Sequence, residues 1–333
     1  MNTILLTEAQ IRDCVSTTPT FDREAISAVA EAFTALAGGK ATSPFPLRLD
    51  VPEHEGRLDV RAAYVRGLGG LAVKVDAGFF DNHCLGLPTR SGVTVVLSAR
   101  TGMPQAVLLD NGYLTGVRAG AAGALAARYL AREDVDTAGV VGAGAQARYQ
   151  IMGLKQVRDF RRLMVYSLLP QEIERYAEEM TARLGVEVVR AEDVETVVRR
   201  SDVVVTCTPT RRPYLKAEWL HPGLHVTAVG ADTQEKRELY TDVLGQADLL
   251  ACAGKSQAFR LGELYHGLEE GIISRQDPIV ELGELTAGQH PGRRDDDQIT
   301  VCVLTSVGVQ DAAIALLVYR RAMQKGLGLR LQS

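Results

Sequence analysis

The chain has 333 residues and few extreme features: it contains one tryptophan, 5% aromatic residues and a net charge of −4. So small a charge gives no reason to expect a nucleic acid or an acidic membrane as partner. The most apolar stretch, residues 119–131, is built of small side chains and interrupted by Arg128. It is too short to span a bilayer. The N-terminal residues lack the basic and apolar segments of a secretory signal.

Cysteines and catalytic motifs are also scarce. The five cysteines (Cys14, Cys84, Cys207, Cys252 and Cys302) are odd in number and scattered, so we expect reduced, mostly buried thiols in a cytoplasmic protein. The sequence has no G-x-S-x-G, no P-loop and no catalytic cysteine–histidine signature. His221 and His225 occupy a loop-to-strand segment rather than one helix face, and we expect core or surface histidines and no metal site.

The length suggests two domains. The first third predicts a helix over 21–38, which stops at glycine, and strands over 57–65, 71–79, 93–99 and 104–110. An alanine-rich helix over 114–131 follows, and strands and helices then alternate. This alternation predicts an α/β fold with a Rossmann-type doubly wound parallel sheet. We expect this sheet within 119–308, and a β-rich domain formed by 1–118 together with 309–333, whose helix over 309–326 returns to it.

A glycine loop follows the first of these alternating strands. Residues 140–147 read VVGAGAQA, which is G-x-G-x-x-A between a strand and a helix. Such a loop favours dinucleotide binding, because the helix N-terminus offers free N–H groups to a pyrophosphate. The acid expected at the end of the next strand is missing from 165–170, although Glu172 lies just beyond. No arginine follows Ser167 either, so the sequence leaves NAD and NADP open.

Three charged residues stand where a structural role is costly. Lys74 falls inside an apolar strand, where it needs a partner or a function; the alternative is a lysine that reaches solvent from an edge strand. We expect Arg118 in the first turn of its helix, where a cation opposes the helix dipole, so we also expect a carboxylate partner for it. Asp232 follows a strand at the sheet edge where ligands bind, or else it caps a helix in the segment after it.

Several motifs together resemble the ornithine cyclodeaminase/μ-crystallin family over nearly the whole chain. They are Lys74, GLPT (86–89), the run from SARTG to ARYLA (98–131), GAGAQA, VTCTPT (205–210), VGADTQEKREL (229–239) and TSVGVQDAA (305–313). Within the family, FFDN, GLP, SARTG and LLDNGYLT look most like the ectoine-utilisation branch, to which the iminosuccinate reductase of the β-hydroxyaspartate pathway is similar. The resemblance implies a Rossmann domain, a β-rich dimerisation and substrate domain, and a homodimer.

The resemblance also implies roles for individual residues. Lys74 and Asp232 would be catalytic, and Arg48, Lys74 and Arg118 would surround the substrate carboxylate. The cofactor, NAD with NADP as the open alternative, would contact a larger set: Thr89, Arg118, Gly142, Gly144, Ala145, Gln146, Ala147, Ser167, Thr206, Thr208, Val229, Gly230, Asp232, Lys236, Ser306, Val307 and Gly308. Of these, Thr89 and the segment 306–308 would lie near the nicotinamide.

One departure from the family bears on the substrate. Many members have Met-Pro-Ala-Tyr where this chain has Arg61-Ala62-Ala63-Tyr64. Our hypothesis is that Arg61 binds a second substrate carboxylate, a task that suits a guanidinium, whereas ornithine's distal ammonium would be repelled. The alternative is a solvent-facing arginine on an exposed strand.

The sequence therefore favours an NAD(P)H-dependent reductase that converts an α-imino acid, first of all iminosuccinate, to an L-amino acid, in this case L-aspartate. Asp232 or Lys74 would keep the imine nitrogen protonated. Three alternatives stay open. They are a cyclodeaminase-type lyase that recycles bound NAD, an ectoine-degradation enzyme, and a crystallin-like protein that binds NADPH and a small ligand with little turnover.

Overall fold

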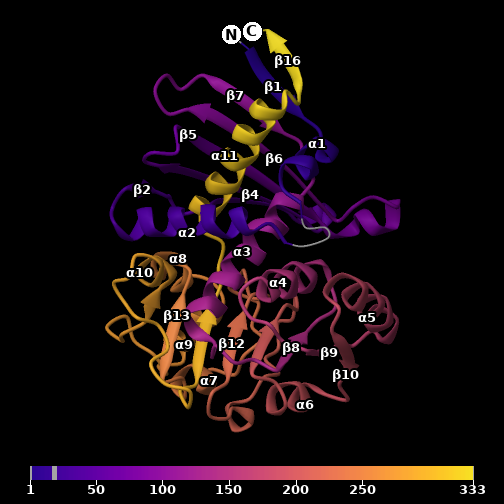
Figure 1. Cartoon of the computed structure of the whole chain (residues 1–333), viewed down its shortest axis with the longest axis vertical. Coiled ribbons are helices and arrows are strands. Elements are labelled where there is room, and N and C mark those ends of the chain that lie inside the picture. Colours follow the sequence, from indigo (N-terminus) through magenta and orange to yellow (C-terminus); the bar gives the residue numbers. More distant parts are fainter. Residues whose placement is uncertain (1, 17–20, 333) are drawn as a thin grey trace. The chain divides into compact units, whose positions relative to one another are not determined.

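The computed structural model describes residues 2–16 and 21–332 (Figure 1). These residues form two compact units. The first unit holds 2–16, 22–118 and 307–332, and the second holds Phe21 and 119–306. The sequence had suggested a division into 1–118 with 309–333, and 119–308. The first unit is therefore built from both ends of the chain.

The first unit contains a mixed sheet in the order β16-β1-β7-β6-β5-β4-β2, with β3 also beside β4. Its strands are β1 (Asn2–Leu6), β2 (Ala41–Thr42), β3 (Leu47–Val51), β4 (Gly56–Val65), β5 (Gly70–Phe79), β6 (Arg90–Ser98), β7 (Pro104–Leu108) and β16 (Leu329–Gln332). Strands β4 to β7 confirm the four strands expected from the sequence. β1 pairs in parallel with β7 and antiparallel with β16.

Helices cover one face of this sheet. They are α1 (Glu8–Cys14), α2 (Arg23–Ala37), which Asp22 caps through two backbone N–H groups, and α11 (Gly308–Lys325). Figure 1 shows α11 in front of the strands, and it packs against β4, β5 and α2. Gly70 of β5 permits this approach, because a Cβ there would lie 2.5 Å from a methyl group of Leu316. The return of the last helix to the first unit is thus confirmed. Two 3-10 turns, η1 (Pro52–His54) and η2 (Phe80–Leu85), complete the unit.

The second unit contains a parallel sheet in the order β10-β9-β8-β11-β12-β15-β13-β14. Its strands are β8 (Thr137–Val141), β9 (Arg162–Tyr166), β10 (Glu187–Arg190), β11 (Val203–Thr206), β12 (His225–Ala228), β13 (Leu249–Cys252), β14 (Val280–Glu281) and β15 (Thr300–Val303). The expected doubly wound sheet is confirmed. The chain winds outward from β8 to β10 and then resumes on the other side of β8 with β11, which is the switch point where such sheets bind ligands.

The helices of the second unit are mostly short. They are α4 (Ala145–Lys155), α5 (Pro170–Leu184), α6 (Val194–Arg199), α7 (Asp242–Gly245), α8 (Lys255–Ala258), α9 (Glu263–Glu269) and α10 (Leu282–Thr286), with the 3-10 turn η3 (Ala217–Trp219). The alanine-rich helix α3 (Tyr113–Leu130) begins in the first unit and continues in the second. Arg118 therefore lies in its second turn rather than its first.

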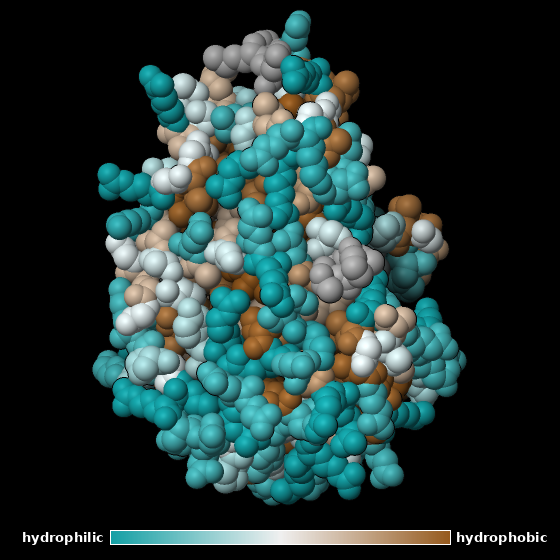
Figure 2. All heavy atoms as spheres, in the orientation of Figure 1, coloured by the Kyte–Doolittle hydropathy of each residue, from teal (hydrophilic) through white to brown (hydrophobic). Residues whose placement is uncertain are grey.

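The surface and the cysteines have the character that the composition suggests. On the side shown in Figure 2, hydrophilic residues predominate and hydrophobic ones form small groups. Among the described residues, no helix is long and apolar enough to cross a membrane. All five cysteines are free thiols, and Cys14, Cys252 and Cys302 are buried.

Candidate functional site

The glycine loop of the second unit has the geometry that its sequence predicts. Gly142 has a φ of +103°, and a Cβ there would lie 2.9 Å from the carbonyl oxygen of Cys207. Gly144 is the N-cap of α4, and no described heavy atom lies within 4 Å of the position of its missing Cβ. Ala147 is fully buried where α4 approaches the strands. The N-terminus of α4, whose first N–H groups have no partner within the helix, and the open space beside Gly144 together fit a pyrophosphate.

The end of β9 is neutral. Ser167 follows the strand, and its hydroxyl accepts a hydrogen bond from the N–H of Leu169 at 3.4 Å. Leu168 is 84% exposed. The two residues offer no charge to select a ribose hydroxyl or a phosphate, which agrees with the open choice of cofactor in the sequence.

A buried carboxylate connects the loops after β11 and β12. Glu238 accepts hydrogen bonds from the hydroxyls of Thr206 and Thr208, each at 2.7 Å, and from the N–H of Gly230, also at 2.7 Å. The N–H of Thr208 and the hydroxyl of Tyr214 donate to it as well. Burial raises the pKa of Glu238, and these donors oppose the rise. Glu238 therefore fixes three residues that the resemblance assigns to the cofactor.

Sequence reasoning missed Glu238, because it read the segment 233–239 as a helix that Asp232 could cap. Residues 229–240, all described, contain no helix, so the capping alternative for Asp232 is wrong. Asp232 instead accepts a hydrogen bond from Lys236 at 2.7 Å. A carboxylate and an ammonium thus stand together just beyond β12. No local pattern marks Glu238, because its partners Gly230, Thr208 and Thr206 lie 8, 30 and 32 residues away in the sequence.

The histidines are structural. His225 is fully buried in β12, and its ring contacts the hydroxyls of Thr227 and Thr300. Burial lowers its pKa to about 3. His221 contacts backbone carbonyl groups. In the described part of the chain, histidine, cysteine and acidic side chains form no group of three that could hold a metal ion.

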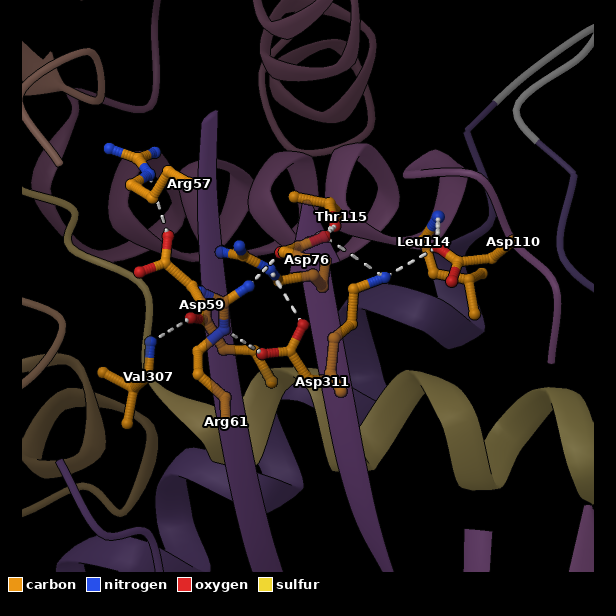
Figure 3. A network of polar contacts seen from close by, with 12 residues as sticks. Arg57, Asp59, Arg61, Asp76, Asp110, Leu114, Thr115, Val307 and Asp311 are labelled. Carbon is orange, nitrogen blue, oxygen red and sulfur yellow. Dashed lines mark hydrogen bonds and ion pairs between the residues drawn. The ribbon is translucent and has the colours of Figure 1, made fainter. Parts of the chain in front are cut away.

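The first unit carries charged residues on the helix-covered face of its sheet. The register aligns Arg61 of β4 with Lys74 of β5 and Thr94 of β6 in one row. The adjacent row aligns Asp59 with Asp76. Side chains of paired residues share a face, so sheet pairing alone brings these cations and carboxylates together. Figure 3 shows Asp59, Arg61 and Asp76 close to Thr115 and Asp311, which belong to α3 and α11.

Lys74, Arg61 and Asp76 belong to a chain of six side chains with alternating charge. Its order is Asp110, Lys74, Asp76, Arg61, Asp311, Arg118. The Lys74 ammonium lies 2.7 Å from Asp110 and 3.7 Å from Asp76. Arg61 donates to Asp76 and, at 3.0 Å, to Asp311. Asp311 also lies 3.2 Å from Nε of Arg118. The expected carboxylate partner of Arg118 is therefore present.

Burial decides between the alternatives for two of these residues. Lys74 is 1% exposed on a central strand, so it is not a lysine that reaches solvent from an edge. A glycine at position 92 leaves room for it, since a Cβ there would lie 3.3 Å from the ammonium. Arg61 is 7% exposed, so the solvent-facing alternative is wrong. Its guanidinium is bonded to two internal carboxylates, a fact that the hypothesis of a second substrate carboxylate did not anticipate.

The pKa values in this cluster follow from burial and pairing. Burial disfavours the charged form of Arg61, but Asp311 and Asp76 outweigh it and raise the pKa. Burial likewise opposes ionisation of Asp76, but Lys74 and Arg61 lower its pKa. For Arg118 burial prevails and lowers the pKa. Nε of Arg118 and Oδ1 of Asp311 lie 3.2 Å apart without hydrogen-bond geometry, so the two groups interact as an ion pair only.

A second, smaller group lies at the edge of the same face. Arg48 of β3 and Arg57 of β4 both pair with Asp59, at 2.9 and 3.1 Å. Both guanidiniums are partly exposed.

Other residues implied by the resemblance lie in the first unit as well. Thr89 precedes β6, and its carbonyl accepts from the N–H of Phe79. Val307 is the N-cap of α11, and Gly308 begins that helix against the carbonyl of Ala62. Ser306 ends the second unit. The structure thus groups Arg48, Arg61, Lys74 and Arg118 in one unit, and the glycine loop, the two threonines and Asp232 in the other.

Comparison with known proteins fits this pair of sites. The model of the ornithine cyclodeaminase/mu-crystallin family matches residues 7–326. The chain belongs to this family. A putative dehydrogenase of Rhizobium meliloti is 45% identical over 99% of this chain and 98% of its own. The alanine dehydrogenase of Archaeoglobus fulgidus is 34% identical over 100% and 99%.

Two further relatives are named as reductases of compounds with a carbon–nitrogen double bond. The iminosuccinate reductase of Paracoccus denitrificans is 30% identical over 93% of this chain and 94% of its own. The solved Δ1-pyrroline-2-carboxylate reductase of Thermococcus litoralis, in complex with NADH and L-proline, superposes with a TM-score of 0.92. It is 30% identical and covers 99% of this chain and 100% of its own. The names of these relatives give them different substrates.

Proposed function

We propose that this protein reduces an α-imino acid to the corresponding L-amino acid with NADH. The chain is a nicotinamide-dependent oxidoreductase that acts on carbon–nitrogen bonds. The observation that carries the proposal is the buried charged cluster around Lys74, which places an ammonium and an arginine together inside a sheet that would otherwise be apolar. Such groups are retained at a cost in stability where they act on a ligand.

The second unit holds the cofactor in this proposal. The open space beside Gly144 and the N–H groups of α4 would bind the pyrophosphate, and the loops fixed by Glu238 would line the cleft. When bound, NADH supplies the hydride. The residues Thr89, Ser306 and Gly308 keep their proposed place near the nicotinamide.

The first unit holds the substrate. Arg118 and Lys74 would bind the α-carboxylate and orient the imine carbon, a positioning effect. The Lys74 ammonium, or Asp232 with its partner Lys236, would keep the imine nitrogen protonated, because a cationic iminium accepts hydride more readily. Reduction then yields an amine, which takes up a proton from water.

Within this class we propose iminosuccinate, with L-aspartate as its product, as the substrate. Arg48 lies at the edge of the same face and is partly exposed, so its guanidinium would receive the second substrate carboxylate. Arginine pairs well with carboxylates because its donors form a planar fork. We also propose that the protein is a homodimer, because one face of the sheet in the first unit is apolar and partly exposed.

The first experiment follows the absorbance of NADH with the purified protein, ammonium, and oxaloacetate or pyruvate as the source of imine. Ammonium-dependent loss of NADH, with the amino acid formed, is the expected result, and oxaloacetate should have the lower KM. Omission of ammonium is the control. If neither keto acid supports oxidation of NADH while ornithine releases ammonia, the reductase proposal is wrong and a cyclodeaminase takes its place.

A further inference from the structure

Arg61 occupies the centre of the six-residue chain of alternating charge. It connects Asp110, Lys74 and Asp76 with Asp311 and Arg118, because it pairs with Asp76 on one side and with Asp311 on the other. It reaches both from β4, whereas Asp311 belongs to α11 near the other end of the sequence. Both of its partners also pair with a cation assigned to the substrate: Asp76 with Lys74, and Asp311 with Arg118.

The balance of charge depends on Arg61. With it, the chain has three cations and three carboxylates, and the cluster is neutral. Without it, Lys74 and Arg118 would face three carboxylates, and a buried negative charge would remain. Screening by solvent is weak at such a site, so an anionic substrate would be repelled.

We propose that Arg61 is a positioning residue that neutralises Asp76 and Asp311, and so leaves Lys74 and Arg118 able to receive the substrate's α-carboxylate. It does not itself bind a second carboxylate. This role rests on the proposed function, since it concerns the same site. It replaces the hypothesis formed from the sequence, in which Arg61 selects dicarboxylates.

Charge neutralisation by Arg61 and binding of a second carboxylate by Arg61 predict different results for the same variant. Arg61→Met should raise KM about tenfold for both the pyruvate imine and the oxaloacetate imine, by the same factor, since α-carboxylate binding is common to both. The value of kcat should change much less than KM. A selective rise for the oxaloacetate imine would overturn the proposal and restore the second-carboxylate role.

A second variant guards against a mere loss of folding. Arg61→Met combined with Asp311→Asn removes one charge of each sign, so the cluster is neutral again. We expect KM for both imines to recover most of the loss, although the guanidinium is still missing. No recovery in a folded double variant, as judged by circular dichroism, would refute the charge-balance role.

A matched control comes from the same strand and face. Arg57→Met also removes one arginine, but from the group around Asp59 and not from the alternating chain. We expect it to leave KM for the pyruvate imine unchanged. An equal rise for this imine in Arg57→Met and Arg61→Met would mean that any nearby positive charge suffices, which contradicts the proposed role of Arg61.

Failure of the proposed function can be told apart from failure of this inference. If the wild-type protein oxidises no NADH with either imine, the reductase proposal fails whatever the variants do. Binding of pyruvate and oxaloacetate is then measured by thermal shift, which needs no turnover. Equal weakening of both anions in Arg61→Met, with recovery in the double variant, would support the inference, and unaltered binding would refute it.

Discussion

At the scale of single residues, a buried lysine defines the site. Lys74 lies between Asp110 and Asp76, and Asp110 also accepts from the N–H of Leu114 at 3.1 Å. Asp110 therefore ties the ammonium to the start of α3. Removal of one partner from a buried ion pair leaves the other charge uncompensated, so a structural and a catalytic role of Lys74 must be separated.

Lys74→Met should lower kcat/KM by about 10²–10⁴, the usual contribution of a proton donor in a fixed position. It should also destabilise the fold by about 3–5 kcal/mol, because Asp110 is left buried and unpaired. The double variant Lys74→Met/Asp110→Asn removes that unpaired charge. We expect urea unfolding to show recovered stability and NADH oxidation to stay lost. Recovery of activity together with stability would show that Lys74 serves the fold alone.

At the scale of elements, the two glycines of the β8–α4 loop have separable tasks. Gly142 needs its positive φ and its close approach to Cys207, whereas Gly144 has an ordinary φ of −82° and open space around it. The fold itself therefore requires Gly142, whereas Gly144 is required only if a pyrophosphate occupies the space beside it. The pair therefore tests the cofactor site without any assumption about the substrate.

Gly144→Ala should leave the melting temperature unchanged and weaken NADH binding about tenfold or more, because the new methyl group enters the space assigned to the pyrophosphate. Gly142→Ala should instead lower the free energy of unfolding by about 1–3 kcal/mol through backbone strain. Thermal melts and NADH fluorescence titrations measure the two effects. Normal NADH binding by a folded Gly144→Ala variant would place the cofactor elsewhere.

Glu263 of α9 makes the stability of the second unit depend on pH. Burial raises its pKa to about 8, against 4.5 in an unfolded chain, although it accepts from the N–H groups of Glu238 and Leu239. Between these values the folded state keeps a proton that the unfolded state has lost. Stability is therefore greatest below pH 4.5 as far as this group is concerned, and it falls as the pH rises to about 8.

Glu263→Gln cannot ionise, so its unfolding free energy should fall less between pH 5 and 8, by up to about 1.4 kcal/mol for each pH unit. Urea denaturation at several pH values measures the difference. The exposed Glu218 provides the control, since Glu218→Gln should follow the wild type. Parallel curves for wild type and Glu263→Gln would show that Glu263 is ionised throughout this range.

Local patterns predicted the elements that are long or regular, and missed those that depend on distant partners. The helices α3 and α11 and the strands β4 to β7 follow from periodicity. β1 and β16 do not, because each is short and gains its place by pairing between opposite ends of the chain. Lys74 and Arg118 stood out as misplaced cations. No local pattern marks Asp311, the partner of Arg118, and only the fold shows that this acid is buried.

At the scale of the whole molecule, the face of the first sheet away from α11 is apolar and incompletely covered. Strands β4, β5 and β6 alternate between buried residues and partly exposed ones. The partly exposed set is apolar: Leu58, Val60, Val73, Val75, Val93 and Val95. Leu47 and Leu49 of β3 extend it by register, and they are 60% and 51% exposed. Contiguous apolar surface of this kind marks an interface.

A second copy of the chain is the partner that fits this face. A sheet face can be its own complement about a twofold axis, and most soluble oligomers are symmetric dimers. Val75, on a central strand, should lie within the contact. We expect Val75→Asp to halve the mass measured by light scattering, because a carboxylate would be buried without a partner. Leu168→Asp, at the exposed leucine of the other unit, is the control and should leave the mass unchanged. If the wild type is already a monomer in dilute solution, the proposed dimer is wrong, and this face must then be covered in another way.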